Sequence, residues 1–180
     1  MKITLKRINA FSKDYKKIIR LYRTAFPADE RAPMWFMTLR SESENADFWG
    51  LYADDEWAGL AYIISDEDVS YLFYIAVSNQ LRGKGIGSKA LQALMKHYAG
   101  QRIFLALEQL DEAADNSEER KRRRQFYLKN GFKPISCRIR EAAVVYDVMS
   151  TGSIMPEEYE RMMKKYLGAA SGLVSMEIIE

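Results

Sequence analysis

Three β-rich segments follow one another in the middle of the chain, and they constrain its fold more than any other feature. They cover residues 48–52, 57–64 and 71–77, and the acidic stretches at 54–56 and 66–68 are short enough to be turns. Aromatic and β-branched runs separated by turn-length polar insertions are typical of antiparallel hairpins. The sequence therefore predicts a three-stranded antiparallel meander.

Helical periodicity and short apolar runs predict the elements on either side of the meander. They are a strand at 3–8, helices near 15–26 and from Pro33, then a helix near 86–98, strands at 103–107, 135–139 and 142–149, and helices at 118–129 and 156–167. The tail from Gly168 receives no assignment. We expect an α/β (α+β) fold: a central, mostly antiparallel mixed sheet of about seven strands, flanked by about four helices, plus a C-terminal helix.

Length and composition exclude several classes of site. The chain has 180 residues, and 27 Lys and Arg against 25 Asp and Glu give a net charge of +2, so no basic field points to nucleic acid or a membrane surface. One cysteine, Cys137, and one histidine, His97, exclude an internal disulfide framework, a multi-cysteine zinc site and a His-rich metal site. Without a membrane-length apolar run or a signal peptide, we expect a cytoplasmic protein without a metal.

A glycine-rich segment at 82–88 lies between the last strand of the meander and the next amphipathic helix. Its glycines allow a tight turn and let an anion approach main-chain N–H groups, and the following helix adds unpaired donors. Gly87-Ser88-Lys89 has the wrong order for a nucleoside-triphosphate loop, and the G-x-G-x-G spacing differs from the G-x-G-x-x-G of dinucleotide folds. The segment is therefore a candidate phosphate or pyrophosphate site.

Two motifs in the correct element order resemble the GNAT superfamily of N-acetyltransferases. The family's coenzyme A signature, Gln/Arg-x-x-Gly-x-Gly/Ala, is matched by Arg82-Gly83-Lys84-Gly85-Ile86-Gly87. A second signature, an aromatic residue followed by Tyr-x-x-x-Gly-Phe, is matched by Phe126-Tyr127-Leu128-Lys129-Asn130-Gly131-Phe132. The resemblance covers residues 1–149 and implies a GNAT-like fold, with acetyl-CoA as the co-substrate.

The resemblance also implies which residues bind the coenzyme. Where the fourth strand separates from the fifth, the pantetheine arm and the acetyl carbonyl would pair with the backbone of Ile75, Ala76 and Val77. The pyrophosphate would bind the N–H groups of Arg82, Gly83, Lys84, Gly85, Ile86, Gly87 and Ser88. Asn116 resembles a family asparagine that contacts the coenzyme.

The implied chemistry is attack of an amine on the thioester, which requires loss of the ammonium proton and protonation of the leaving thiolate. Tyr127 matches the family tyrosine beside the sulfur and is the candidate general acid, with packing between Phe126 and Phe132 as the alternative. Many members have a glutamate on the fourth strand that acts as the general base, and the corresponding position here is Tyr71. We therefore name Glu108 and Glu30 as candidate bases; each has a purely structural alternative, a strand-end acid and a helix-start acid respectively.

Other notable residues have simpler interpretations. The basic run at 120–124 is expected to be a solvated helix face, with contact to the coenzyme's 3′-phosphate as an alternative. Cys137 is expected to be buried. Trp35, Phe36 and Trp49 are candidates for an aromatic acceptor cleft or for ordinary core.

The sequence thus predicts an acetyl-CoA-dependent N-acetyltransferase acting on a primary amine. Use of another acyl-CoA and a catalytically silent coenzyme-binding module remain as alternatives. We expect a GNAT domain at 1–150 and a helical extension at 151–180. The Tyr and Met stripe of the extension must be buried against the sheet or a second subunit, and we favour a homodimer contact.

Overall fold

A computed structural model of the protein describes residues 1–141 and 144–178. The chain forms two compact units. The N-terminal unit comprises Met1–Ile64 and Leu72–Ala99, and the C-terminal unit comprises Ser65–Tyr71 and Gly100–Glu180. Each unit is described below on its own.

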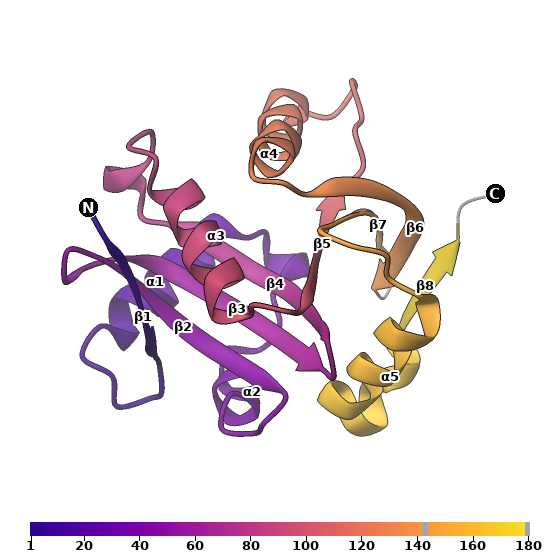
Figure 1. The fold of residues 1–180 in the computed structure, drawn as a ribbon, viewed down its shortest axis with the longest axis horizontal. Helices are drawn as coiled ribbons and strands as arrows, with labels where there is room; N and C mark the ends of the chain where they lie inside the picture. Colours follow the sequence, from indigo (N-terminus) through magenta and orange to yellow (C-terminus); the bar gives the residue numbers. More distant parts are fainter. Residues whose placement is uncertain (142–143, 179–180) are drawn as a thin grey trace. The chain divides into compact units, whose positions relative to one another are not determined.

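The elements alternate in the order that the sequence predicts (Figure 1). They are β1 (Ile3–Arg7), α1 (Tyr15–Ala25), η1 (Ala28–Glu30), α2 (Met34–Arg40), β2 (Ala46–Ala53), β3 (Glu56–Asp66), β4 (Val69–Val77), η2 (Asn79–Leu81), α3 (Ile86–His97), β5 (Arg102–Glu108), α4 (Ser117–Lys129), β6 (Lys133–Glu141), β7 (Val144–Ser150), α5 (Pro156–Leu167), η3 (Gly168–Leu173) and β8 (Val174–Ile178). The strands are hydrogen-bonded in the order β1-β2-β3-β4-β5-β7-β6-β8. The first two residues of the strand predicted at 142–149 lie outside the described residues, and β8 forms in the tail that the sequence left unassigned.

In the N-terminal unit, the two faces of the strands are covered by different helices (Figure 1). Phe48 and Trp49 are neighbours on β2, so their side chains point to opposite faces. Phe48 packs against Tyr62 of β3, whose hydroxyl donates to the Met37 carbonyl of α2 at 3.0 Å. The Trp49 indole donates to the Tyr98 hydroxyl, just after α3, at 2.8 Å. Trp49 is therefore core beneath α3, on the face opposite α2, which is the second of the two alternatives given above for this residue.

The C-terminal unit is built around β5, which has a parallel neighbour on one side and an antiparallel neighbour on the other. Val69–Tyr71 of β4 pair in parallel with Arg102–Phe104, and β7 pairs antiparallel along Phe104–Glu108. β6 pairs antiparallel with both β7 and β8. The sheet is therefore mixed, as predicted.

The apolar stripe of α5 is buried within this chain. Tyr159, Met162, Met163 and Tyr166 are at most 1% exposed. A second subunit is therefore not needed to cover the stripe, which removes the reason given above for a homodimer. The oligomeric state itself stays a prediction.

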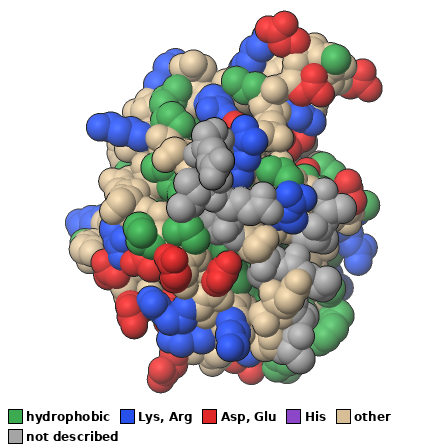
Figure 2. All heavy atoms as spheres, turned by 90° about the vertical axis from the view of Figure 1, so that its right-hand side faces the viewer, with side chains coloured by type: hydrophobic (Ala, Val, Ile, Leu, Met, Phe, Trp, Pro, Cys, Tyr) green, Lys and Arg blue, Asp and Glu red, His purple; other side chains and the backbone are tan. Residues whose placement is uncertain are grey.

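Ion pairs fix α5 to the rest of the C-terminal unit. Glu158 accepts hydrogen bonds from Arg102 at 2.6 and 3.1 Å, and Arg102 also binds Asp68 at 2.8 Å. The Asp66 carboxylate, in the hairpin between β3 and β4, binds both Arg161 and Lys165. On the face drawn in Figure 2, basic and acidic side chains are interspersed. The domain boundary predicted at residue 150 stays a prediction, although α5 contacts β-strand residues from before that boundary.

Candidate functional site

The glycine loop turns into α3 through a left-handed residue. Gly85 is the residue before the helix and has a φ of 75°, and Gly83 has a φ of 77°. A Cβ added at either glycine would meet no atom within 4 Å. Glycine is thus required by the backbone conformation and not by crowding, because L-residues adopt this region at a cost of about 1–2 kcal/mol.

The first turn of α3 leaves main-chain donors available. The N–H groups of Ile86, Gly87 and Ser88 have no acceptor within the helix because the residues four positions earlier precede it. No side-chain hydrogen bond from its N-cap residue caps the helix. Together with the positive end of the helix dipole, these donors suit a phosphate group.

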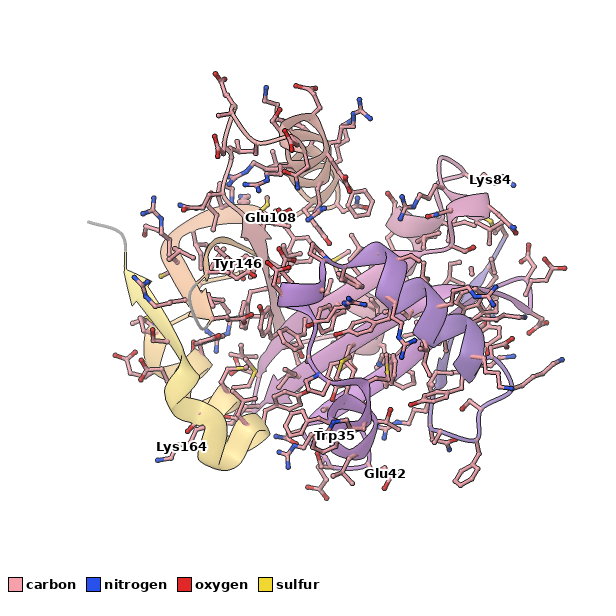
Figure 3. The ribbon with its side chains drawn as sticks, turned by 180° about the vertical axis from the view of Figure 1, so that it is seen from behind. Trp35, Glu42, Lys84, Glu108, Tyr146 and Lys164 are labelled. Atoms are coloured by element: carbon pink, nitrogen blue, oxygen red, sulfur yellow. The ribbon has the colours of Figure 1, made fainter. Side chains whose placement is uncertain are left out.

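Two cationic side chains extend from the same loop. Arg82 and Lys84 are exposed, and in the described ranges neither forms an ion pair. Among the described residues, the Arg82 side chain makes one long hydrogen bond, from Nε to the Val77 carbonyl at 3.5 Å. Figure 3 labels Lys84 on this loop, with its side chain directed outwards. The loop therefore offers both main-chain donors and unneutralised positive charge.

The end of β4, where the coenzyme's acyl arm is predicted to bind, is shaped by a bulge in β3. The β2–β3 register skips Ala58, and the Ala58 carbonyl instead accepts a hydrogen bond from the Ser78 N–H at 2.8 Å. A Cβ on Gly59 would lie 2.2 Å from the carbonyl oxygen of Ala76. Gly59 is therefore necessary for this close approach, and sequence reasoning missed it. The available signal was a glycine inside a strand, which often marks a bulge.

Glu30 lies in a segment that β4 holds in place. The Tyr74 hydroxyl donates to the Glu30 carbonyl at 2.7 Å and accepts from the Ala32 N–H at 3.0 Å. Tyr22 of α1 donates to the Ala32 carbonyl at 3.0 Å. Glu30 is half-buried. Within the N-terminal unit, the structure thus ties Glu30 to the strand that carries Ile75, Ala76 and Val77.

Glu108 and Asn116 belong to a network of charges in the C-terminal unit. Glu108 ends β5 (Figure 3), and its carboxylate binds Arg120 at 3.1 Å and Arg123 at 2.8 Å. The Asn116 amide donates to Glu108 at 3.1 Å, and its oxygen accepts from Arg120 at 2.7 Å. Both predicted site residues are therefore brought together, but their polar atoms are already engaged with each other and with α4.

The basic run of α4 forms ion pairs with other elements of the C-terminal unit and is not simply a solvated face. Arg120 and Arg123 bind Glu108, and Arg124 binds Asp147 of β7. Tyr127 is the only described α4 residue classed as buried. α4 lacks an apolar stripe, and these ion pairs attach it to β5 and β7. The prediction of a solvated face is therefore wrong for these three arginines.

Tyr127 is a buried phenol near the end of α4. It is 6% exposed, and its ring packs edge-on against Phe126 and Phe132 at centroid distances of 5.1 and 5.7 Å. Its phenol has no hydrogen-bond partner within the described residues. Burial raises the pKa of Tyr127 to about 12, against a smaller opposing effect of the Arg123 guanidinium. The group is therefore protonated at neutral pH and has a proton to donate.

The surroundings of Cys137 and His97 indicate structural roles for both residues. Cys137 is buried, and burial raises the pKa of its thiol, which disfavours a nucleophilic thiolate. His97 contacts the rings of Trp49 and Tyr98. Among the described residues, no group of three or more His, Cys, Asp or Glu side chains is arranged to hold a metal ion. In that part of the chain no helix is long and apolar enough to cross a membrane.

The comparisons with known proteins agree on one family. Residues 15–132, more than half of the chain, match the model of the acetyltransferase (GNAT) family. A GNAT-family acetyltransferase structure from Bacteroides thetaiotaomicron has a TM-score of 0.74 at 20% identity, covering 94% of this chain and 98% of that one. No match is found among curated proteins.

Two further structures share the fold and hold a coenzyme. An aminoglycoside 6′-N-acetyltransferase complexed with coenzyme A has a TM-score of 0.63 at 19% identity, covering 87% of this chain and 98% of that one. A GNAT acetyltransferase from Elizabethkingia anophelis with acetyl-CoA bound has a TM-score of 0.59 at 12% identity, covering 84% and 99%. The fold and the family model together show that this chain belongs to the GNAT acetyltransferase family.

Proposed function

We propose that the protein transfers an acetyl group from acetyl-CoA to a primary amine, by direct attack through a tetrahedral intermediate. The observation that carries the proposal is the glycine loop. It combines left-handed glycines, uncapped first-turn N–H groups and two cations that form no ion pair with a described residue. Similar proteins described as complexes with coenzyme A or acetyl-CoA support this choice of donor.

Each part of the proposed donor site fits one part of coenzyme A. The N–H groups of residues 82–88 would bind the pyrophosphate, and Arg82 and Lys84 would neutralise its charge. The backbone of residues 75–77 would pair with the pantetheine arm, with the Val77 N–H donating to the oxyanion of the tetrahedral intermediate. Asn116 remains a proposed coenzyme contact, although it would have to exchange its hydrogen bonds to Glu108 and Arg120.

Tyr127 is the proposed proton donor to the leaving thiolate. A phenol with a pKa of about 12 stays protonated until the thiolate forms. A thiolate in the same apolar surroundings is also a stronger base than in water, because burial disfavours its charge. The higher basicity of the buried thiolate therefore offsets part of the acidity that the phenol loses on burial.

Glu30 and Glu108 are the two proposed bases, and different elements hold them. Two guanidinium groups and an amide occupy the Glu108 carboxylate, so its lone pairs serve the attachment of α4. Glu30 is held on a segment fixed by β4. We retain both as proposals, with Glu30→Gln and Glu108→Gln turnover as the comparison.

The deciding experiment measures thiol release from acetyl-CoA with a panel of primary amines. Turnover with an amine, and its absence with the matching alcohol, would support the proposal. Faster thiol release with succinyl-CoA than with acetyl-CoA would indicate a different acyl donor. Tight binding of coenzyme A in calorimetry without turnover on any amine would indicate a silent coenzyme-binding module. A cytoplasmic location remains part of this proposal, as does action without a metal or nucleic acid.

A further inference from the structure

Glu141, the last residue of β6, lies in an aromatic cluster that the proposed mechanism does not use. Its Oε1 accepts hydrogen bonds from the hydroxyls of Tyr71 at 2.9 Å and Tyr159 at 3.2 Å. The Tyr71 ring stacks on Phe104 at 4.6 Å, and the Tyr159 ring lies edge-on to both at 6.0 and 6.1 Å. Tyr71, Phe104 and Tyr159 are at most 2% exposed, whereas Glu141 is half-buried.

Among the described residues, Glu141 differs from the other carboxylates of the C-terminal unit that are not fully exposed because it has no cationic partner there. Four others each bind at least one lysine or arginine: Asp66, Glu108, Asp147 and Glu158. In the described part of the chain no lysine or arginine reaches Glu141. Two phenols are weak compensation for a shielded negative charge, since buried charges are normally paired.

The electrostatics of the cluster agree with this geometry. Burial raises the pKa of Glu141, and the hydrogen bonds from Tyr71 and Tyr159 oppose this only in part. The second carboxylate oxygen accepts no hydrogen bond from a described residue. A cation brought to that oxygen would therefore satisfy an acceptor and neutralise the charge.

We propose that Glu141, framed by Tyr71, Phe104 and Tyr159, binds the ammonium group of the amine acceptor. An alkylammonium supplies a positive charge and up to three N–H donors, which the second carboxylate oxygen of Glu141 can accept. This proposal rests on the proposed function for the identity of the ligand. The binding event itself needs no acetyl-CoA, so it can be tested separately.

The test compares n-butylammonium chloride with n-butanol as ligands of the full chain, by saturation-transfer NMR. Glu141→Gln keeps the shape and an acceptor for both phenols but removes the charge. We expect wild type to bind butylammonium at least tenfold more tightly than butanol, and Glu141→Gln to lose that difference. Glu160→Gln, an exposed change on α5, is the matched control and should behave as wild type.

Equal binding of butylammonium by wild type and Glu141→Gln would overturn the proposal, as would no binding to wild type. If Glu141→Gln fails to fold, the side-chain carboxyl ¹³C signal of Glu141 in the wild type replaces it. That signal should move on adding butylammonium and not butanol, and an unmoved signal would overturn the proposal. Thiol release from acetyl-CoA, measured separately, reports on the proposed function alone.

Discussion

Each unit contains one cationic segment: the glycine loop before α3 in the N-terminal unit, and the basic run of α4 in the C-terminal unit. The two segments differ in what their positive charges contact. In the loop before α3, Arg82 and Lys84 are exposed and form no ion pair within the described ranges. On α4, Arg120, Arg123 and Arg124 bind carboxylates of β5 and β7. The positive charge of the loop is therefore available for a ligand, whereas the three α4 arginines form ion pairs that attach the helix to β5 and β7.

The comparison teaches that the number of cations in a segment does not determine its role. The α4 run is the more basic in sequence, but three of its guanidinium groups already bind carboxylates. The glycine loop carries fewer charges, and its main-chain donors and dipole add to them. Four predictions test this contrast.

The largest effect is expected from Gly85→Val. Valine disfavours the left-handed conformation, so the turn into α3 should change and the N–H groups should lose their alignment. We expect calorimetric binding of coenzyme A to weaken by more than about 100-fold, as for the loss of several charge-assisted hydrogen bonds. Gly100→Val is the matched control, because Gly100 has a φ of 90° and equally open space. Wild-type affinity in a folded Gly85→Val protein would refute the loop assignment.

Tyr127→Phe tests chemistry in the C-terminal unit without changing its packing. The ring stays between Phe126 and Phe132, and only the hydroxyl group with its proton is lost. We expect kcat to fall by roughly 10²–10³ with coenzyme affinity and Tm little changed. The readout is the acetyl-transfer step in pre-steady-state kinetics, since product release can mask the chemical step. An unchanged transfer step would make Tyr127 a packing residue only.

The main effect of Glu108→Gln should be on the free energy of unfolding, and its effect on coenzyme A affinity should be smaller. It leaves Arg120 and Arg123 without their shared carboxylate at the junction of β5 and α4. Because Arg123 is 35% exposed, solvent moderates the loss, and we expect about 1–3 kcal/mol in denaturant unfolding. If turnover instead falls by more than about 100-fold while stability is preserved, Glu108 is the base and the ion pairs are secondary.

The smallest effect is expected from neutralising single loop cations. Arg82→Gln and Lys84→Gln should each weaken coenzyme A binding by about threefold to tenfold, because exposed charges are screened by solvent. The loss should shrink as salt is raised. Arg122→Gln, an exposed change on α4, should leave affinity unaltered. An equal effect from Arg122 would place the coenzyme's phosphates near α4 and remove the contrast between the two segments.

Much of the fold was accessible from local sequence patterns. Acidic turns at Asp54 and Glu67 separate β2, β3 and β4, and both residues adopt positive φ values as tight turns require. The amphipathic stripe of α5 predicted its buried face correctly. Predictions succeeded here because hydrophobic periodicity and turn chemistry act over a few residues.

The sequence by itself determined the family signatures, the glycine loop and the order of the elements, since each depends on neighbouring residues. The tertiary structure decided which charged side chains form ion pairs and which stay available for a ligand. Arg120 and Arg123 meet Glu108 only because α4 packs back on β5, and Glu141 meets Tyr71 and Tyr159 across 70 and 18 residues. It also decided that β8 forms, because β6 offers an edge to pair with. Pairing across such separations depends on packing and desolvation at distant positions, which no local pattern encodes.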